Sequence, residues 1–311
     1  MTDVTLITSL YQSAGFLPQY IAQAQALARE VAQAGVGLEF VIIPNNASDE
    51  ERALLTGLEK VLVAEGIASV QIHYVTRETL YASWNRGMGY ARGASFGIWN
   101  VDDQRTPQGV IAGHRALANG ADLIDLAFNI NKGGQVKRHA PQYRPDSLAP
   151  RTAVSPFFMF HRRLWQRAGA FIPHFRIVGD FEWSKRAIVR EAQVQRSDVI
   201  AGTFNLHADN LSGGTPTEWV EFNIALLMHD APELMRPVDP SLMRQYWEDW
   251  GQEVASISEE HARWLWGDGA QARYERYQWE RNLHPFARRI LLALARRGWA
   301  YSLDWELHHG R

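Results

Sequence analysis

The sequence predicts an α/β fold with a mostly parallel central sheet, flanked by helices and followed by a helical C-terminal extension. One observation is a set of short apolar runs, typical of strands buried on both faces, at residues 4–10, 38–43, 69–75 and 95–99. Helical segments, each with glycine near its end, separate these runs at 17–35, 49–66 and 79–93. Strands that alternate with helices in this way favour right-handed crossovers and a parallel sheet.

The pattern changes in two steps further along the chain. Beyond residue 107 it predicts, in order, a helix at 107–120, a strand at 122–130, a strand at 155–160 and helices at 162–169 and 179–193. From about residue 215 the chain becomes rich in arginine and tryptophan, with eight of its 12 tryptophans between Trp219 and Trp305. We therefore expect a first domain at 1–214 and a helical extension at 215–311.

Composition limits the classes of function. Hydrophobic residues make up 46% and charged residues 21%, as in globular proteins. The absence of cysteine excludes disulfides, thiol nucleophiles and zinc–thiolate sites. The formal net charge of −2 gives no sign of a nucleic-acid partner, and we expect none. The N-terminus lacks the basic region of a secretory signal, and no apolar run is long enough to span a bilayer, so we expect a cytoplasmic protein.

Polar segments follow three of the predicted strands, at residues 11–15, 44–51 and 100–107. Because ligands of open parallel sheets bind beyond the carboxyl ends of the strands, the three segments are expected to surround one ligand. The third segment carries Asp102 and Asp103, whose adjacent charges repel unless a cation, hydrogen bonds or water relieve them. The simpler alternative is an N-cap aspartate before the helix at Pro107, worth about 1 kcal/mol.

The motifs, taken in order, resemble those of family 2 glycosyltransferases of the GT-A fold, which move a sugar from a nucleotide-sugar to an acceptor. The resemblance covers about the first 210 residues. The segments that carry it are ITSLYQSAGFLP (7–18), FVIIPNNASDEE (40–51), WNRGMGYARG (84–93), NVDDQRTP (100–107) and GDFEWSKR (179–186). The resemblance implies an inverting, metal-dependent transferase that uses a nucleotide-diphosphate sugar.

The resemblance also implies a divalent metal, Mn²⁺ or Mg²⁺, held by oxygen ligands beside the diphosphate. The segment NVDDQRTP occupies the D-x-D position of the family, with Asn100 in place of the first acid, and Asp102 and Asp103 are the expected ligands. His207 lies where some relatives place a histidine near the metal, although a lone histidine after a strand is more often structural.

The expected general base is Asp180, in the late acidic motif. Inversion needs a carboxylate that takes the proton of the acceptor hydroxyl. The alternative is a carboxylate that only offsets the dipole at the start of a helix. Glu182 is the nearby competitor for the role of base.

The residues expected to contact the nucleotide-sugar share a position in, or next to, the family's donor-binding motifs. They are Tyr11, Asn45, Asp49, Trp84, Asn85, Asn100 and Arg105. Tyr11 would stack on the base, although a partly buried tyrosine at a strand end is an equally good interpretation. The chain departs from the family pattern at Pro44, Trp84 and Asn100, which leaves the identity of the nucleotide open.

The resemblance implies a glycan or lipid-linked acceptor and a role in the synthesis of a bacterial surface polysaccharide. The arginine-rich apolar segment 284–305 is expected to allow peripheral membrane contact. An alternative is a GT-A domain without catalysis that binds a nucleotide-sugar or glycan as the partner of an active enzyme. Nucleotidyl transfer fits less well, because the loop after the first strand has no lysine.

Overall fold

The computed structural model describes residues 2–144, 154–208, 210–211 and 216–229. The chain divides into two compact units between residues 211 and 212. Helix α7 (Pro216–Met228) is the described element of the second unit. The segment expected to contact a membrane lies outside the described residues. Within the described ranges, no helix has both the length and the apolar character needed to cross a bilayer.

The first unit contains one nine-stranded sheet, in the order β3-β2-β1-β4-β8-β6-β9-β5, with β7 paired to β6. The strands are β1 (Val4–Leu10), β2 (Leu38–Pro44), β3 (Ser69–Ile72), β4 (Ser95–Ile98), β5 (Gln104–Arg105), β6 (Leu123–Lys132), β7 (Gln135–His139), β8 (Met159–His161) and β9 (Val194–Leu206). Strands β1 to β4 form a continuous parallel block, and β6 and β9 are also parallel. The predicted α/β class is confirmed.

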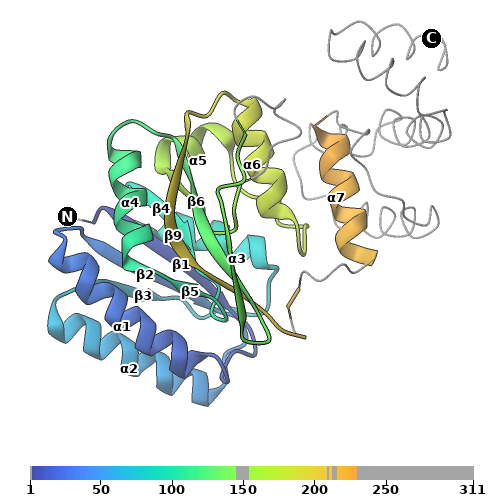
Figure 1. Cartoon of the computed structure of the whole chain (residues 1–311). Coiled ribbons are helices and arrows are strands. Elements are labelled where there is room, and N and C mark those ends of the chain that lie inside the picture. The colour runs from blue at the N-terminus through green and yellow to red at the C-terminus, as the bar shows by residue number, and fades with distance from the viewer. Residues whose placement is uncertain (1, 145–153, 209, 212–215, 230–311) are drawn as a thin grey trace, which may run out of the picture. The chain divides into compact units, whose positions relative to one another are not determined.

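Helices cover both faces of the sheet (Figure 1). They are α1 (Leu17–Gln33), α2 (Asp49–Glu65), α3 (Leu80–Tyr90), α4 (Pro107–Ala118), α5 (Arg162–Ala168) and α6 (Gly179–Val189). Alternate strand residues face opposite sides. Leu6, Phe40 and Ile42 join the core under α1, α2 and α4. Ile7 and Ile43 lie under α3, where a Cβ on Gly87 would be 2.6 Å from the Ile7 side chain.

The parallel block brings the polar segments to one edge. Strand β1 pairs with β2 and with β4, so that Leu10 lies opposite Pro44 and Ile7 opposite Ile98. The segments that begin at Tyr11, Asn45 and Trp99 therefore leave the sheet at the same edge. The crossover from β3 to α3 also starts there, because Val75 forms an isolated parallel bridge with Asn45.

The second half of the sheet differs from the expected elements. The strand expected at 155–160 is only β8, because residues 155–158 form a turn closed by the Phe158 N–H on the Ser155 carbonyl. Part of the basic stretch after residue 132 is strand β7, since Gly133 and Gly134 adopt positive φ angles of 58° and 87° and close a hairpin with β6. Strand β9 has 13 residues, longer than any run marked by the sequence pattern.

Candidate functional site

Tyr11 and Arg77 form an exposed pair at the carboxyl-end edge of the parallel block. The Arg77 guanidinium carbon lies 3.9 Å from the centre of the Tyr11 ring, and its Nη1 donates to the Tyr11 hydroxyl at 2.7 Å. Tyr11 is 39% exposed. No carboxylate of the described ranges pairs with Arg77, so the guanidinium keeps donors available for an anionic or acceptor-rich ligand.

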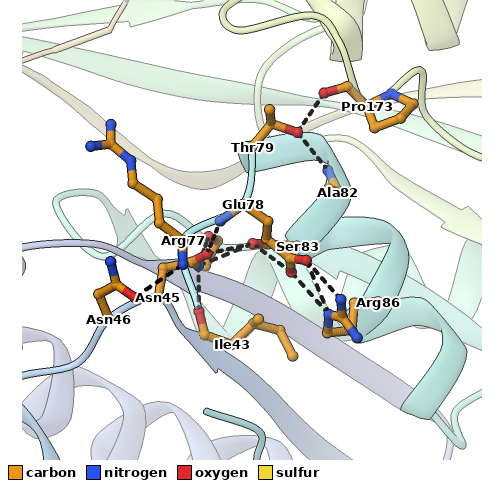
Figure 2. A network of polar contacts seen from close by, with 11 residues as sticks. Ile43, Asn45, Asn46, Arg77, Glu78, Thr79, Ala82, Ser83, Arg86 and Pro173 are labelled. Atoms are coloured by element: carbon orange, nitrogen blue, oxygen red, sulfur yellow. Dashed lines mark hydrogen bonds and ion pairs between the residues drawn. The ribbon is translucent and has the colours of Figure 1, made fainter. Parts of the chain in front are cut away.

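A polar network holds the backbone of the segment that carries Arg77 (Figure 2). Asn46 accepts the Arg77 N–H at 3.1 Å, and Asn45 accepts the Glu78 N–H at 2.9 Å. The Asn45 amide also donates to the Ile43 carbonyl and to the Ser83 hydroxyl at 3.1 and 3.0 Å. These bonds tie the end of β2 to the start of α3. Asn45 is buried and fully engaged, so a direct contact with a nucleotide stays a prediction.

Asp102 meets His207 across the edge of the sheet. The Asp102 Oδ2 is 3.0 Å from the His207 Nε2, and the side chains of both are partly exposed. The Asn210 amide nitrogen lies 3.4 Å from the same carboxylate oxygen and 3.3 Å from the imidazole nitrogen. A carboxylate, an imidazole and an amide thus converge, from segments more than 100 residues apart in the chain.

Asp103 points away from this cluster, into the protein. It is 4% exposed, and its Oδ1 accepts the Asn205 N–H at 3.0 Å. Asn100 donates to its other oxygen at 3.4 Å. Burial, together with the neighbouring charge of Asp102, raises the pKa of Asp103 to about 8. The two adjacent aspartates therefore differ: Asp103 braces the loop against β9, and Asp102 faces the cluster.

The two carboxylates and the histidine expected to bind metal do not form a single group. Within the described ranges, no three His, Asp or Glu side chains lie together as a metal site. Asp102 and His207 have the oxygen and nitrogen donors that Mn²⁺ accepts, and they fit such an ion as a pair. Asp103 does not fit, because its oxygens are turned to Asn205 and Asn100.

Asp180 lies in the first turn of α6, where the carboxylate is favoured by the positive end of the helix. Its Oδ1 accepts the Phe181 N–H at 2.9 Å and the Tyr81 hydroxyl at 3.2 Å. Tyr81 is in the first turn of α3, which follows the crossover at the carboxyl-end edge. Asp180 is therefore held beside that edge. Glu182 is fully buried in an ion pair with Arg186, 2.8 Å long, which gives it a structural role.

Three other residues predicted to contact the nucleotide-sugar have partners inside the protein. Trp84 is buried against the rings of Tyr81 and Phe171. The Asn85 amide donates to the Phe171 carbonyl at 2.8 Å and accepts the Phe171 N–H at 2.9 Å. Arg105 is buried and donates twice to the Ile98 carbonyl, at 3.0 and 2.7 Å, and burial lowers its pKa to about 10. Their contact with a ligand stays a prediction.

The remaining predicted residues lie at element ends. Asp49 is the exposed first residue of α2, whose N-terminus is capped by Ser48 and Glu51 in a capping box. Asn100 is half-buried and bonds to Asp103. Arg77 and Asn210 were missed by the sequence analysis. The open-sheet rule, applied to the segment after the third strand, would have found Arg77, whereas no local signal marked Asn210.

Comparison with solved structures finds the same fold elsewhere. S. aureus TarS 1–349 in complex with UDP-GlcNAc matches with a TM-score of 0.59 at 13% identity, covering 100% of this chain and 93% of that one. The mannosyltransferase PcManGT from Pyrobaculum calidifontis, in complex with GDP-Man and Mn²⁺, matches with a TM-score of 0.53 at 12% identity, covering 97% and 82%. The chain shares the fold of these two proteins. No family model and no curated protein matches the sequence.

Within this fold, eight of the predicted site residues form two groups. Tyr11, Asp102, Asp180 and His207 are at least partly exposed at or beside the carboxyl-end edge of the parallel block. Asn45, Trp84, Asn85 and Arg105 bond to or pack against other residues of the same unit. The side chains of the first group are open to solvent, whereas those of the second have partners inside the protein.

Proposed function

We propose that the chain is a family 2 glycosyltransferase that moves a sugar, with inversion, from a nucleotide-diphosphate sugar to a glycan or lipid-linked acceptor. The observation that carries the proposal is the pair formed by Asp102 and His207, 3.0 Å apart at the edge where an open sheet binds its ligands. The neighbours with UDP-GlcNAc and GDP-Man support a nucleotide-sugar as donor.

In this proposal Tyr11 and Arg77 contact the nucleotide. Both are exposed, and the ring of Tyr11 offers a flat surface on which a base stacks at little entropic cost. The guanidinium of Arg77 lies over that ring, and on binding of the donor it would move to the acceptor atoms of the base or to the phosphates. Asp49 and Asn100, at the neighbouring loop ends, complete the proposed donor site.

Asp102 and His207 would hold a divalent cation, Mn²⁺ or Mg²⁺, with the diphosphate of the donor. When bound, such an ion stabilises the negative charge of the departing diphosphate. The presence of Mn²⁺ in the mannosyltransferase neighbour supports this assignment. The expected role of Asp103 as a ligand is replaced by a bracing role, because its oxygens accept hydrogen bonds inside the protein.

Asp180 is the proposed general base. The acceptor hydroxyl oxygen attacks the anomeric carbon from the face opposite the diphosphate, and the bond from that carbon to the diphosphate oxygen breaks. Asp180 takes the hydroxyl proton as the new glycosidic bond forms, so that charge does not accumulate on the acceptor oxygen. The position of Asp180 in the first turn of α6, beside the carboxyl-end edge, supports this role.

A second candidate function is a domain that binds a nucleotide-sugar or glycan without catalysis. It is favoured by the finding that, in the part of the chain that the structure describes, no three His, Asp or Glu side chains gather as a metal site. A binding domain needs a nucleotide surface, such as the Tyr11–Arg77 pair, but neither a metal nor a base.

Thermal-shift measurements with UDP, GDP, CMP and dTDP, each with and without MnCl₂, test both candidates. The transferase proposal expects one nucleotide to raise the melting temperature and manganese to increase that shift. The Asp102→Ala variant should lose the manganese-dependent part and keep the rest. If a nucleotide raises the melting temperature equally with and without manganese, in the parent protein and in the variant, the binding domain is favoured. If no nucleotide raises the melting temperature, both candidate functions are contradicted.

A further inference from the structure

Tyr81 joins the crossover after β3 to the segment that carries Asp180. It is 1% exposed, in the first turn of α3, and its hydroxyl donates to the Ile177 carbonyl at 2.6 Å. The same hydroxyl lies 3.2 Å from the Asp180 Oδ1. A hydroxyl has one proton, so the two acceptors share it. A burial this complete prevents the ring from touching a substrate.

Close packing fixes the position of the Tyr81 ring against the start of α6. A Cβ placed on Gly179 would lie 2.7 Å from two carbons of that ring, so any side chain there forces a shift. Trp84 meets the other part of the ring edge-on, with centroids 4.9 Å apart. Because the residue directly before Asp180 rests on the ring, a movement of Tyr81 moves the carboxylate.

The rest of α3 binds the same segment farther upstream. Asn85 pairs with both backbone groups of Phe171, and Thr79, the N-cap residue just before α3, donates its hydroxyl to the Pro173 carbonyl. Residues 169–178 form no helix or strand. Their backbone groups therefore need partners from elsewhere, and several of these are side chains of α3. Tyr81 binds the segment at Ile177, and its hydroxyl also reaches the Asp180 carboxylate.

We propose that Tyr81 is a positioning residue for Asp180, which its hydroxyl orients toward the acceptor side of the site. This inference rests on the proposed transferase function. One hydrogen bond to a charged group restricts the rotation of the carboxylate and so holds its free oxygen in one orientation. The effect is expected on the transfer step, because the Tyr81 hydroxyl binds at Ile177 and Asp180, whereas the donor nucleotide is proposed to bind at Tyr11 and Arg77.

The test is Tyr81→Phe, which keeps the ring and removes one oxygen. We expect kcat to fall about tenfold, the size expected for one lost hydrogen bond to a charged group. The donor KM and the nucleotide Kd, measured by calorimetry, should stay within about twofold. Tyr90→Phe, on the exposed end of the same helix, is the matched control and should leave kcat unchanged.

A double mutant separates a positioning role from a general loss of packing. In an Asp180→Asn background, Tyr81→Phe should give no further loss of the residual rate, because its effect passes through the carboxylate. Gly179→Ala supplies a second variant, which displaces the ring without removing its hydroxyl, and it too should lower kcat and spare nucleotide binding.

The outcomes distinguish the inference from the function on which it rests. If Asp180→Asn is inactive while Tyr81→Phe and Gly179→Ala both match the parent protein, the positioning role is wrong and the transferase proposal stands. A rise in donor KM at constant kcat, or an equal further loss in the double mutant, also overturns the positioning role. If the parent protein transfers sugar from none of the donors tested, the transferase proposal is wrong, and with it the positioning role that rests on it.

Discussion

The two faces of the sheet hold their helices by different means. On one face, α1, α2 and α4 rest on a largely aliphatic core that includes Leu27, Leu58 and Ile42. On the other, α3 covers Ile7 and Ile43 and joins α5 and α6 in a cluster of rings, which includes Phe160 and Trp183 with centroids 4.5 Å apart. We call these the aliphatic face and the aromatic face.

The aromatic face adds directional bonds to the irregular segment between α5 and α6. Trp183 donates its indole N–H to the Gly169 carbonyl at 2.8 Å, and Arg186 donates to the Ala168 and Ala170 carbonyls at 2.6 and 2.9 Å. Asn85 and Tyr81 bind the same segment from α3. Apolar burial stabilises without fixing direction, whereas hydrogen bonds fix one conformation. The irregular segment leads to Asp180, so the chemistry is expected to depend on the aromatic face.

The largest expected effect tests whether the aromatic face carries the chemistry at all. Asp180→Asn removes the proposed base and should lower kcat by about a thousandfold or more, in the upper part of the range for lost acid–base catalysis. Donor binding should remain, because Asp180 is not part of the proposed nucleotide contacts. The measurements are sugar transfer under saturating donor and calorimetric titration of the nucleotide. Near-normal turnover would remove Asp180 from the role.

A substitution on the aliphatic face should lower the stability of the protein and leave kcat nearly unchanged. Leu58 is fully buried in α2, and Leu58→Ala leaves a cavity that should cost about 2–5 kcal/mol of unfolding free energy. Urea denaturation measures the loss. The kcat of the folded protein should change less than twofold. A large fall in kcat would show that catalysis also depends on the aliphatic face.

Asn85→Ala should lower both stability and kcat, and so fall between Leu58→Ala and Asp180→Asn. It leaves the N–H and the carbonyl of Phe171 without their partner, which should cost about 1–3 kcal/mol of stability. Because the irregular segment loses an anchor, we also expect kcat to fall about tenfold. Comparing urea midpoints and kcat with those of Leu58→Ala sharpens the contrast. A stability loss equal to that of Leu58→Ala, with no loss of kcat, would contradict it.

The smallest effect is expected at the surface of the aliphatic face. Arg29 in α1 and Glu65 in α2 form an exposed ion pair 2.7 Å long. Exposed pairs contribute little, because water and salt screen the charges. Arg29→Ala should leave the melting temperature and the nucleotide-induced shift unchanged within error. A clear drop in the melting temperature would mean that the helix pair depends on more than its apolar contacts.

The sequence predicts the first half of the fold well, because local signals define it. Strand β1 and the starts of α1 and α2 match the expected bounds. The start of α2 shows the reason: the Ser48 hydroxyl accepts the Glu51 N–H, and Glu51 accepts the Ser48 N–H, within four consecutive residues. Strand β7 was not predicted, and β8 is shorter than the strand expected at 155–160, because the extent of a strand depends on the partners with which it pairs.

The amino-acid sequence by itself determined the alternation of strands and helices, the edge at which the polar loops gather and the candidates Asp102 and Asp180. Only the tertiary structure decided which of the two adjacent aspartates faces outward. Asp103 turns inward because its partner, the Asn205 N–H, is 102 residues away, and Asp102 meets His207 over a similar separation. Periodicity and caps act between neighbours in the chain, but the orientation of a side chain depends on the partners that folding brings to it.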